Sequence, residues 1–166
     1  MCLFHSYNKV IFITYCICTL SCFSPDSKKA DMLSFNLLLI DSSTVLKSDD
    51  IPTGKPIVFI FFSPGCEHCQ KETEDLLRNI NYLRNVLIFF IAVDPVNQLK
   101  EFNDYYKLSH YSNIILGRDY SFSIPKYFEI NTTPFIALYN RYKQLEAIIP
   151  GEAKIEHVIQ EINKLN

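Results

Sequence analysis

The chain has 166 residues, of which 48% are hydrophobic, and this is enough to bury the core of one ordinary domain. Its 16 basic and 18 acidic residues are interspersed and leave a formal net charge of −2, so the sequence offers neither a basic face for nucleic acid nor an acidic tail. It also contains no internal repeat and no low-complexity tract, which excludes a solenoid. We therefore expect a single globular domain without a nucleic-acid partner.

The first 22 residues have the pattern of an export signal. Residues 10–20 form an uncharged, apolar run that is too short to span a bilayer comfortably and has the length of a signal-peptide core. Residues 19–22, Thr-Leu-Ser-Cys, resemble a bacterial lipobox with threonine at the usual leucine position, so Cys22 would carry lipid. An ordinary cleaved signal and an uncleaved anchor are the alternatives. We expect residues 23–33 to form a tether and residues 34–166 to fold in the periplasm or cell envelope, held at the membrane by the lipid or anchor.

Export would leave few free thiols in the mature protein. Cys22 would be acylated, and three further cysteines would leave with the signal: Cys2, Cys16 and Cys18. Only Cys66 and Cys69 would remain, which excludes a framework of structural disulfides. A cysteine pair with no other thiol to exchange with suits reversible redox chemistry.

In chain order, the folded part should begin with a hairpin and a buried strand. Residues 34–40 and 44–46 flank a polar turn, and residues 57–62, Ile-Val-Phe-Ile-Phe-Phe, are typical of a central strand covered on both faces. Ser-Pro-Gly ends that strand. A helix of about four turns should then start at Cys66, because the residues of one face recur at helical spacing: Cys69, Thr73, Leu76, Leu77, Ile80 and Leu83.

The second half alternates strands and helices. Residues 85–93 predict another buried strand, Asp94 an N-cap, and Pro95 the first residue of a helix. Later elements are strands at 113–116, 135–139 and 144–149, a short or irregular helix within 120–130 interrupted at Pro125, and a last amphipathic helix over 155–165. This order predicts an α/β fold in which helices flank a central mixed sheet, with an extra N-terminal β-hairpin. A Cys-x-x-Cys at a strand-to-helix turn makes it the thioredoxin-like plan.

The spacing of Cys66 and Cys69 indicates thiol exchange. A thiolate, not a thiol, attacks a disulfide, and Cys66 would lie at a helix N-terminus, where unpaired N–H groups and the helix dipole favour negative charge. Cys69 lies one turn later on the apolar stripe and should be buried. We therefore predict that Cys66 attacks and that Cys69 resolves the mixed disulfide.

The residues between the cysteines, Glu67 and His68, are candidates for tuning the redox pair. A protonated or hydrogen-bonding His68 would stabilise the Cys66 thiolate and make the disulfide a stronger oxidant, whereas Glu67 would act in the opposite direction unless it points to solvent. The alternative is that His68 is simply an exposed residue at the start of the helix.

Thr133-Pro134 is the second half of the candidate site. Proline adopts the cis peptide at modest cost, and a cis bond would expose the preceding backbone to an extended chain. The alternative is an ordinary proline that opens the strand at 135–139. Together with the cysteine motif, this context favours a cis proline.

These motifs together resemble the thioredoxin superfamily, and within it the exported TlpA/ResA-like thiol-disulfide oxidoreductases. The resemblance covers roughly residues 34–165 and rests on residues 56–69, on Glu72 in a Cys-x-x-Cys-x-x-Glu pattern, on residues 92–95 and on residues 132–135. It implies that Cys66 is the nucleophile, Cys69 the resolving cysteine and Thr133-Pro134 the substrate-contact loop. It also implies protein thiol or disulfide substrates, a membrane electron donor and no cofactor beyond the redox-active disulfide.

The sequence departs from this family at two places. Strand 57–62 lacks the acidic residue that accepts the proton of the buried cysteine in many members, so water or Glu72 could serve instead. Pro64-Gly65 replaces the aromatic residue that is common before the first cysteine, so the rim of the site should differ.

Three other functions compete with thiol exchange. Zinc or copper could bind the cysteines and an adjacent histidine, but a closed zinc site normally needs four ligands, and the remaining histidines show no suitable spacing. A peroxiredoxin-like peroxidase would need a Ser- or Thr-containing pocket loop before Cys66, where the chain has Pro64-Gly65. A noncatalytic binding module would be expected to have lost one cysteine. We expect no resident metal, and copper handling stays open because it needs fewer ligands.

Overall fold

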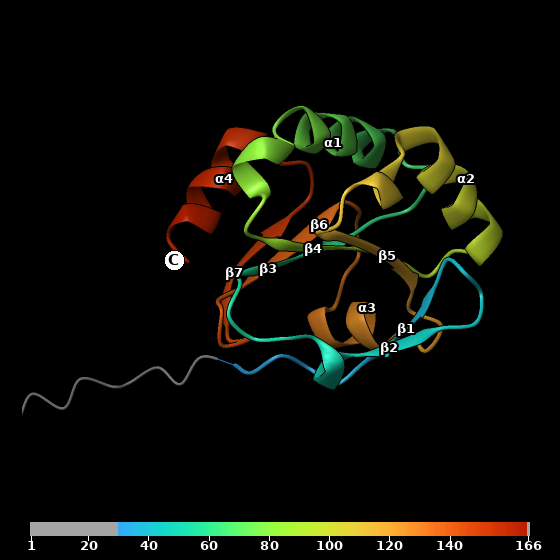
Figure 1. Ribbon diagram of the computed structural model, residues 1–166, viewed down its shortest axis with the longest axis horizontal. Helices are drawn as coiled ribbons and strands as arrows, with labels where there is room; N and C mark the ends of the chain where they lie inside the picture. Colours follow the sequence, from blue (N-terminus) through green and yellow to red (C-terminus); the bar gives the residue numbers. More distant parts are fainter. Residues whose placement is uncertain (1–29, 166) are drawn as a thin grey trace, which may run out of the picture.

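The computed structural model describes residues 30–165, which form one mixed sheet with helices on both faces (Figure 1). The strands are β1 (Asn36–Leu39), β2 (Val45–Lys47), β3 (Ile57–Phe61), β4 (Leu87–Ala92), β5 (Ile114–Arg118), β6 (Phe135–Tyr139) and β7 (Leu145–Pro150). The α-helices are α1 (Glu67–Arg78), α2 (Val96–Tyr106), α3 (Ser123–Phe128) and α4 (Ile155–Asn163), with 3-10 turns η1 (Ser48–Asp50), η2 (Ile80–Leu83) and η3 (Leu108–His110). The predicted signal and Cys22 lie outside the described residues. Between residues 30 and 165, no helix is long and apolar enough to cross a membrane.

The seven strands lie in the order β2-β1-β5-β4-β3-β6-β7, so β3 lies between β4 and β6. β3 runs parallel to β4 and antiparallel to β6, and Phe61 at the end of β3 pairs with Phe135 at the start of β6. The segment that follows β3 and the segment that precedes β6 therefore meet at the same edge of the sheet. This register brings residues about 67 positions apart in the chain into one site.

Alternate residues of β3 enter two separate cores, because successive side chains of a strand point to opposite faces. Val58 and Ile60 pack with α1, α2 and α4, whereas Ile57, Phe59 and Phe61 pack on the face that α3 covers (Figure 1). All five β3 residues are buried. The predicted central strand and the predicted helices on both faces are thus confirmed.

The predicted N-terminal hairpin is also present and extends the sheet. The Asp41 carboxylate accepts hydrogen bonds from the backbone N–H groups of Ser43 and Thr44 and so closes the turn between β1 and β2. β1 then pairs antiparallel with β5. Before this hairpin, Asp31 forms an isolated antiparallel bridge with Gln144.

Three predicted helix boundaries were wrong. The helix after Cys66 ends at Arg78, not near Leu83, because the side-chain amide of Asn79 donates to the carbonyl oxygen of Asp75 and the chain tightens into η2. Asp94 does not cap α2; it accepts a hydrogen bond from Ser63, and the N-cap is Pro95. Pro125 does not interrupt α3, since it lies in the first turn, where its missing N–H has no helical acceptor.

Candidate functional site: the Cys66–Cys69 pair

Cys66 is the N-cap residue of α1, as predicted. Its sulfur accepts a hydrogen bond from the backbone N–H of Cys69 at 3.4 Å, which satisfies one of the free donors at the helix start. The same sulfur lies 3.7 Å from the carbonyl oxygen of Thr133. The Thr133–Pro134 peptide bond is cis, as predicted. The structure therefore brings together the cysteine pair and the loop before β6, and it holds both cysteines as free thiols.

The turn from β3 into α1 is fixed by hydrogen bonds at both ends. The Cys66 N–H donates to the carbonyl oxygen of Ser63 at 3.1 Å, and the Ser63 hydroxyl donates to Asp94 after β4 at 3.2 Å. The side-chain amide of Gln70 donates to the carbonyl oxygen of Pro64 at 2.8 Å. These contacts orient the first turn of α1, and with it the Cys66 sulfur, relative to the sheet.

The two thiols differ in their readiness to ionise. Partial burial raises the pKa of Cys66, but hydrogen bonds from Cys69, from Thr133 and from the backbone N–H of His68 outweigh it, and the net pKa is lowered. Cys69 is only 2% exposed. Burial, and next its hydrogen bond to Cys66, raise its pKa to about 12. The partly exposed Cys66 thiol is therefore the readier nucleophile, and the buried Cys69 thiol holds its proton.

Glu72 lies one helical turn after Cys69 and is 5% exposed. Neither of its carboxylate oxygens has a hydrogen-bond partner of ordinary geometry within residues 30–165. Burial raises the pKa of Glu72 to about 7, and the nearby backbone N–H of Ala153 opposes this shift. A carboxyl with such a pKa can exchange a proton near neutral pH.

The residues between the cysteines are both exposed. The His68 ring is engaged with Glu152, with 2.9 Å between Nδ1 and Oε2, and it is the backbone N–H of His68 that hydrogen-bonds the Cys66 sulfur. Glu67 lies on the surface in the first turn of α1. Tuning by these two side chains stays a prediction.

Sequence reasoning missed Glu152 and Gln70 as neighbours of the site. The Glu152 carboxylate also accepts a hydrogen bond from Lys71, with 2.8 Å between Nζ and Oε1. Glu152 therefore links the start of α1 to the loop before α4. No motif marks Glu152, since it lies 84 positions after His68. Gln70 gives only the weak signal of a polar residue in the first turn.

Within the part of the chain that the structure describes, no group of three or more His, Cys, Asp and Glu side chains is arranged to hold a metal ion.

Similar architectures occur among solved structures of redox proteins. A secreted disulfide oxidoreductase of Mycobacterium tuberculosis homologous to E. coli DsbE matches with a TM-score of 0.66 at 18% identity, over 79% of this chain and 96% of that one. The exposed lipoprotein thioredoxin Etrx1 of Streptococcus pneumoniae matches with a TM-score of 0.63 at 18% identity, over 80% and 100%. The peroxidoxin BcpB of Mycobacterium tuberculosis matches with a TM-score of 0.70 at 12% identity, over 83% and 97%.

The chain has a thioredoxin-like fold. No protein-family model and no curated protein matches the sequence. Because the identities are low, the likeness establishes the fold and leaves the activity to be argued from the Cys66–Cys69 site.

Proposed function

We propose that this protein is a thiol-disulfide oxidoreductase of the cell envelope, which reduces disulfides of other exported proteins. The observation that carries the proposal is the inequality of the two thiols: Cys66 is accessible with a lowered pKa, and Cys69 is buried with a raised one. A structural or noncatalytic cysteine pair does not need thiols of different accessibility and pKa. Stepwise thiol exchange does, because one thiol must attack first and the other must wait.

The reaction has two steps. The Cys66 thiolate attacks one sulfur of the substrate disulfide, forms a mixed disulfide and releases the other substrate sulfur as a thiolate. Cys69 then loses its proton and attacks the Cys66 sulfur, which releases the second substrate thiolate and leaves a Cys66–Cys69 disulfide. Two electrons pass to the substrate, whose thiolates take up protons. A membrane electron donor would return the pair to the dithiol state.

Glu72 is the candidate acceptor for the Cys69 proton. It lies one turn further along the same buried face of α1, and its pKa of about 7 lets it accept a proton at neutral pH. β3 carries no acidic residue that could do this instead. Glu72 therefore substitutes, in this chain, for an acid inside the strand.

Thr133 and Pro134 are the proposed contact for the substrate backbone. The Thr133 carbonyl faces the Cys66 sulfur, so an extended substrate segment that pairs with this residue would bring its own sulfur to Cys66.

The envelope location is supported by the predicted export signal and by two proteins of similar fold, one secreted and one an exposed lipoprotein. Equilibration of the protein with glutathione or dithiothreitol buffers tests the direction. A reduction potential near that of thioredoxin, about −270 mV, would support a reductase, and one near −120 mV would indicate a disulfide donor. Absence of any reversible redox couple would refute the proposal.

A peroxidase is the second candidate, because the peroxidoxin BcpB has the same overall fold. Peroxide consumption by the reduced protein distinguishes the two activities. Turnover of peroxide without exchange of protein disulfides would favour the peroxidase, and a copper titration of the same preparation tests metal handling.

A further inference from the structure

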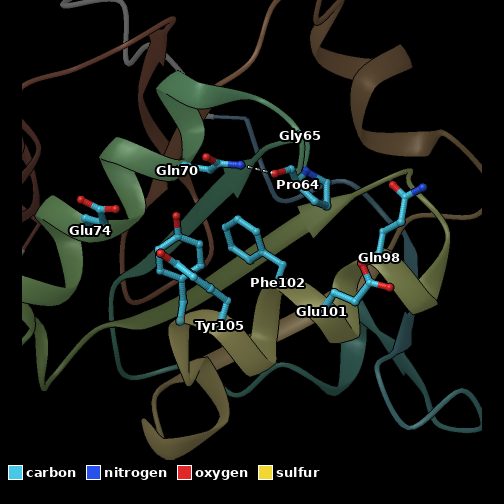
Figure 2. A pocket seen from close by; sticks show the side chains of 9 residues that line it. Pro64, Gly65, Gln70, Glu74, Gln98, Glu101, Phe102 and Tyr105 are labelled. Atoms are coloured by element: carbon cyan, nitrogen blue, oxygen red, sulfur yellow. Dashed lines mark hydrogen bonds between the residues drawn. The ribbon is translucent and has the colours of Figure 1, made fainter.

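A groove of about 560 Å³ lies between α1 and α2 (Figure 2). Pro64 and Gly65, the two residues before Cys66, form one end of it. The groove therefore begins next to the turn that carries Cys66. Figure 2 shows the Gln70 side chain hydrogen-bonded to the Pro64 carbonyl, a contact that fixes this end of the groove.

The floor and one wall of the groove are aromatic. The rings of Phe102 and Tyr106 lie 4.6 Å apart, and Tyr105 packs edge-on against Tyr106 at 4.8 Å. Phe102 is buried beneath the groove, whereas Tyr105 is 76% exposed. An exposed aromatic ring held against a second ring offers a face for the stem and the cation of a long side chain.

The charge on the groove has one sign. Glu74 from α1 and Glu101 from α2 line it, and no Lys, Arg or His side chain of residues 30–165 does. Glu101 has no ion pair within residues 30–165. Glu74 has a long ion pair with Arg78, at 3.8 Å, and Arg78 is in closer contact with Asp75. One carboxylate without an ion pair and one with only a long ion pair, next to three aromatic rings, are complementary to a positively charged side chain.

We propose that this groove binds an arginine or lysine side chain that flanks the reactive cysteine of the substrate protein. The inference rests on the proposed function, and it names the substrate class as proteins with a basic residue within a few positions of the disulfide. The aliphatic stem lies along Tyr105 and Tyr106, and the cation pairs with Glu101, while Glu74 adds negative charge to the groove. Arginine is favoured over lysine because its planar guanidinium can stack on a tyrosine ring while it binds a carboxylate.

Short peptides that carry one cysteine as a mixed disulfide with 2-mercaptoethanol test this inference. Each pair of peptides differs only in having arginine or its uncharged isostere citrulline, at one of the three positions before or after the cysteine. The second-order rate of exchange with the reduced protein is measured at low salt by chromatography. We expect at least one arginine peptide to react about 3- to 10-fold faster than its citrulline partner, and salt to reduce the difference.

Variants locate the preference in the groove. The double variant Glu74→Gln and Glu101→Gln should lose the arginine preference and keep its rate with citrulline peptides. The double variant Asp49→Asn and Asp50→Asn makes the same change of charge in η1, outside the groove, and should keep the preference. Both pairs of side chains are exposed, so folding should be unaffected.

The outcomes separate the two proposals. Exchange at equal rates with every arginine and citrulline peptide, or a preference that survives in the Glu74→Gln, Glu101→Gln protein, would overturn the groove inference alone. Absence of exchange with any peptide would remove the proposed function, and the groove inference with it.

Discussion

The Nδ1 atom of His68 lies 2.9 Å from Oε2 of Glu152, so the motif histidine pairs with the loop before α4. Lys71 binds the other oxygen of the same carboxylate at 2.8 Å, and these contacts lower the pKa of Glu152. The positive charge that His68 could place near the Cys66 thiolate is therefore opposed by a carboxylate that no sequence motif marks.

Changes at His68 and Glu152 should shift the redox potential in opposite directions. Glu152→Gln removes the opposing negative charge, so the Cys66 pKa should fall further and the potential should become more oxidising. His68→Ala should make it more reducing. Because both side chains are largely exposed, we expect shifts of about 10–30 mV, measured against glutathione buffers. Potentials equal to that of the unmodified protein in both variants would show that the ring does not tune the pair.

Replacement of Cys66 and replacement of Cys69 should have different effects on thiol exchange. Cys66→Ala removes the nucleophile and should abolish exchange with protein disulfides. Cys69→Ala leaves the first step intact but removes the resolving thiol, so mixed disulfides should accumulate and be visible on non-reducing gels. Full exchange activity in the Cys66→Ala protein would contradict the proposed order of attack.

Thr133 should hold down the pKa of Cys66 through its side chain, which is among the groups that hydrogen-bond the sulfur. Thr133→Val keeps the shape and the backbone carbonyl but removes this donor. The Cys66 pKa, followed by thiolate absorbance, should rise toward the ordinary value of a cysteine. Thr132→Val, at the exposed neighbouring position, is the matched control and should leave the titration unchanged.

Glu72 should make the stability of the protein depend on pH. Burial raises its pKa from 4.5 to about 7. Between these values the folded protein holds a proton that the unfolded chain has lost, so the free energy of unfolding should fall as pH rises, by up to about 3 kcal/mol. Glu72→Gln cannot ionise and should lose this decline in urea unfolding measured from pH 4.5 to 8.

The same Glu72→Gln variant should slow the resolution step. Mixed disulfides would then persist longer at neutral pH than in the unmodified protein, while the first attack by Cys66 keeps its rate. Glu156→Gln, on the exposed side of α4, is the control for both measurements. If neither the pH dependence of stability nor the resolution rate changed, water rather than Glu72 would be the acceptor of the Cys69 proton.

Gly117, where the N-terminal hairpin joins the sheet, should be required for full stability because β1 packs closely against it. A Cβ atom at this position would lie 3.0 Å from the Cβ of Leu37 and 3.4 Å from the carbonyl oxygen of Leu38. Gly117→Ala should therefore destabilise the protein by about 1–3 kcal/mol in chemical unfolding. Gly65→Ala meets no atom within 4 Å and serves as the steric control. Equal stability of the two variants would show that β1 moves to accommodate the methyl group.

The sequence by itself determined the strands, the α/β order, the position of Cys66 at a helix start and the burial of Cys69. These features are local: apolar runs bounded by proline and glycine specify buried strands, and a Cys-x-x-Cys at a helix start specifies which sulfur is exposed. The helix ends were less predictable, because Asn79 and Asp94 have side-chain partners that compete with simple capping rules.

Only the tertiary structure decided which distant residues meet. The pairing of β3 with β6 places the Thr133 carbonyl against Cys66, and the position of α4 brings Glu152 to His68. The groove between α1 and α2 likewise depends on how two helices pack on one face of the sheet. Contacts of this kind follow from strand register and helix packing, which are properties of the whole core and leave no periodic signal in the chain.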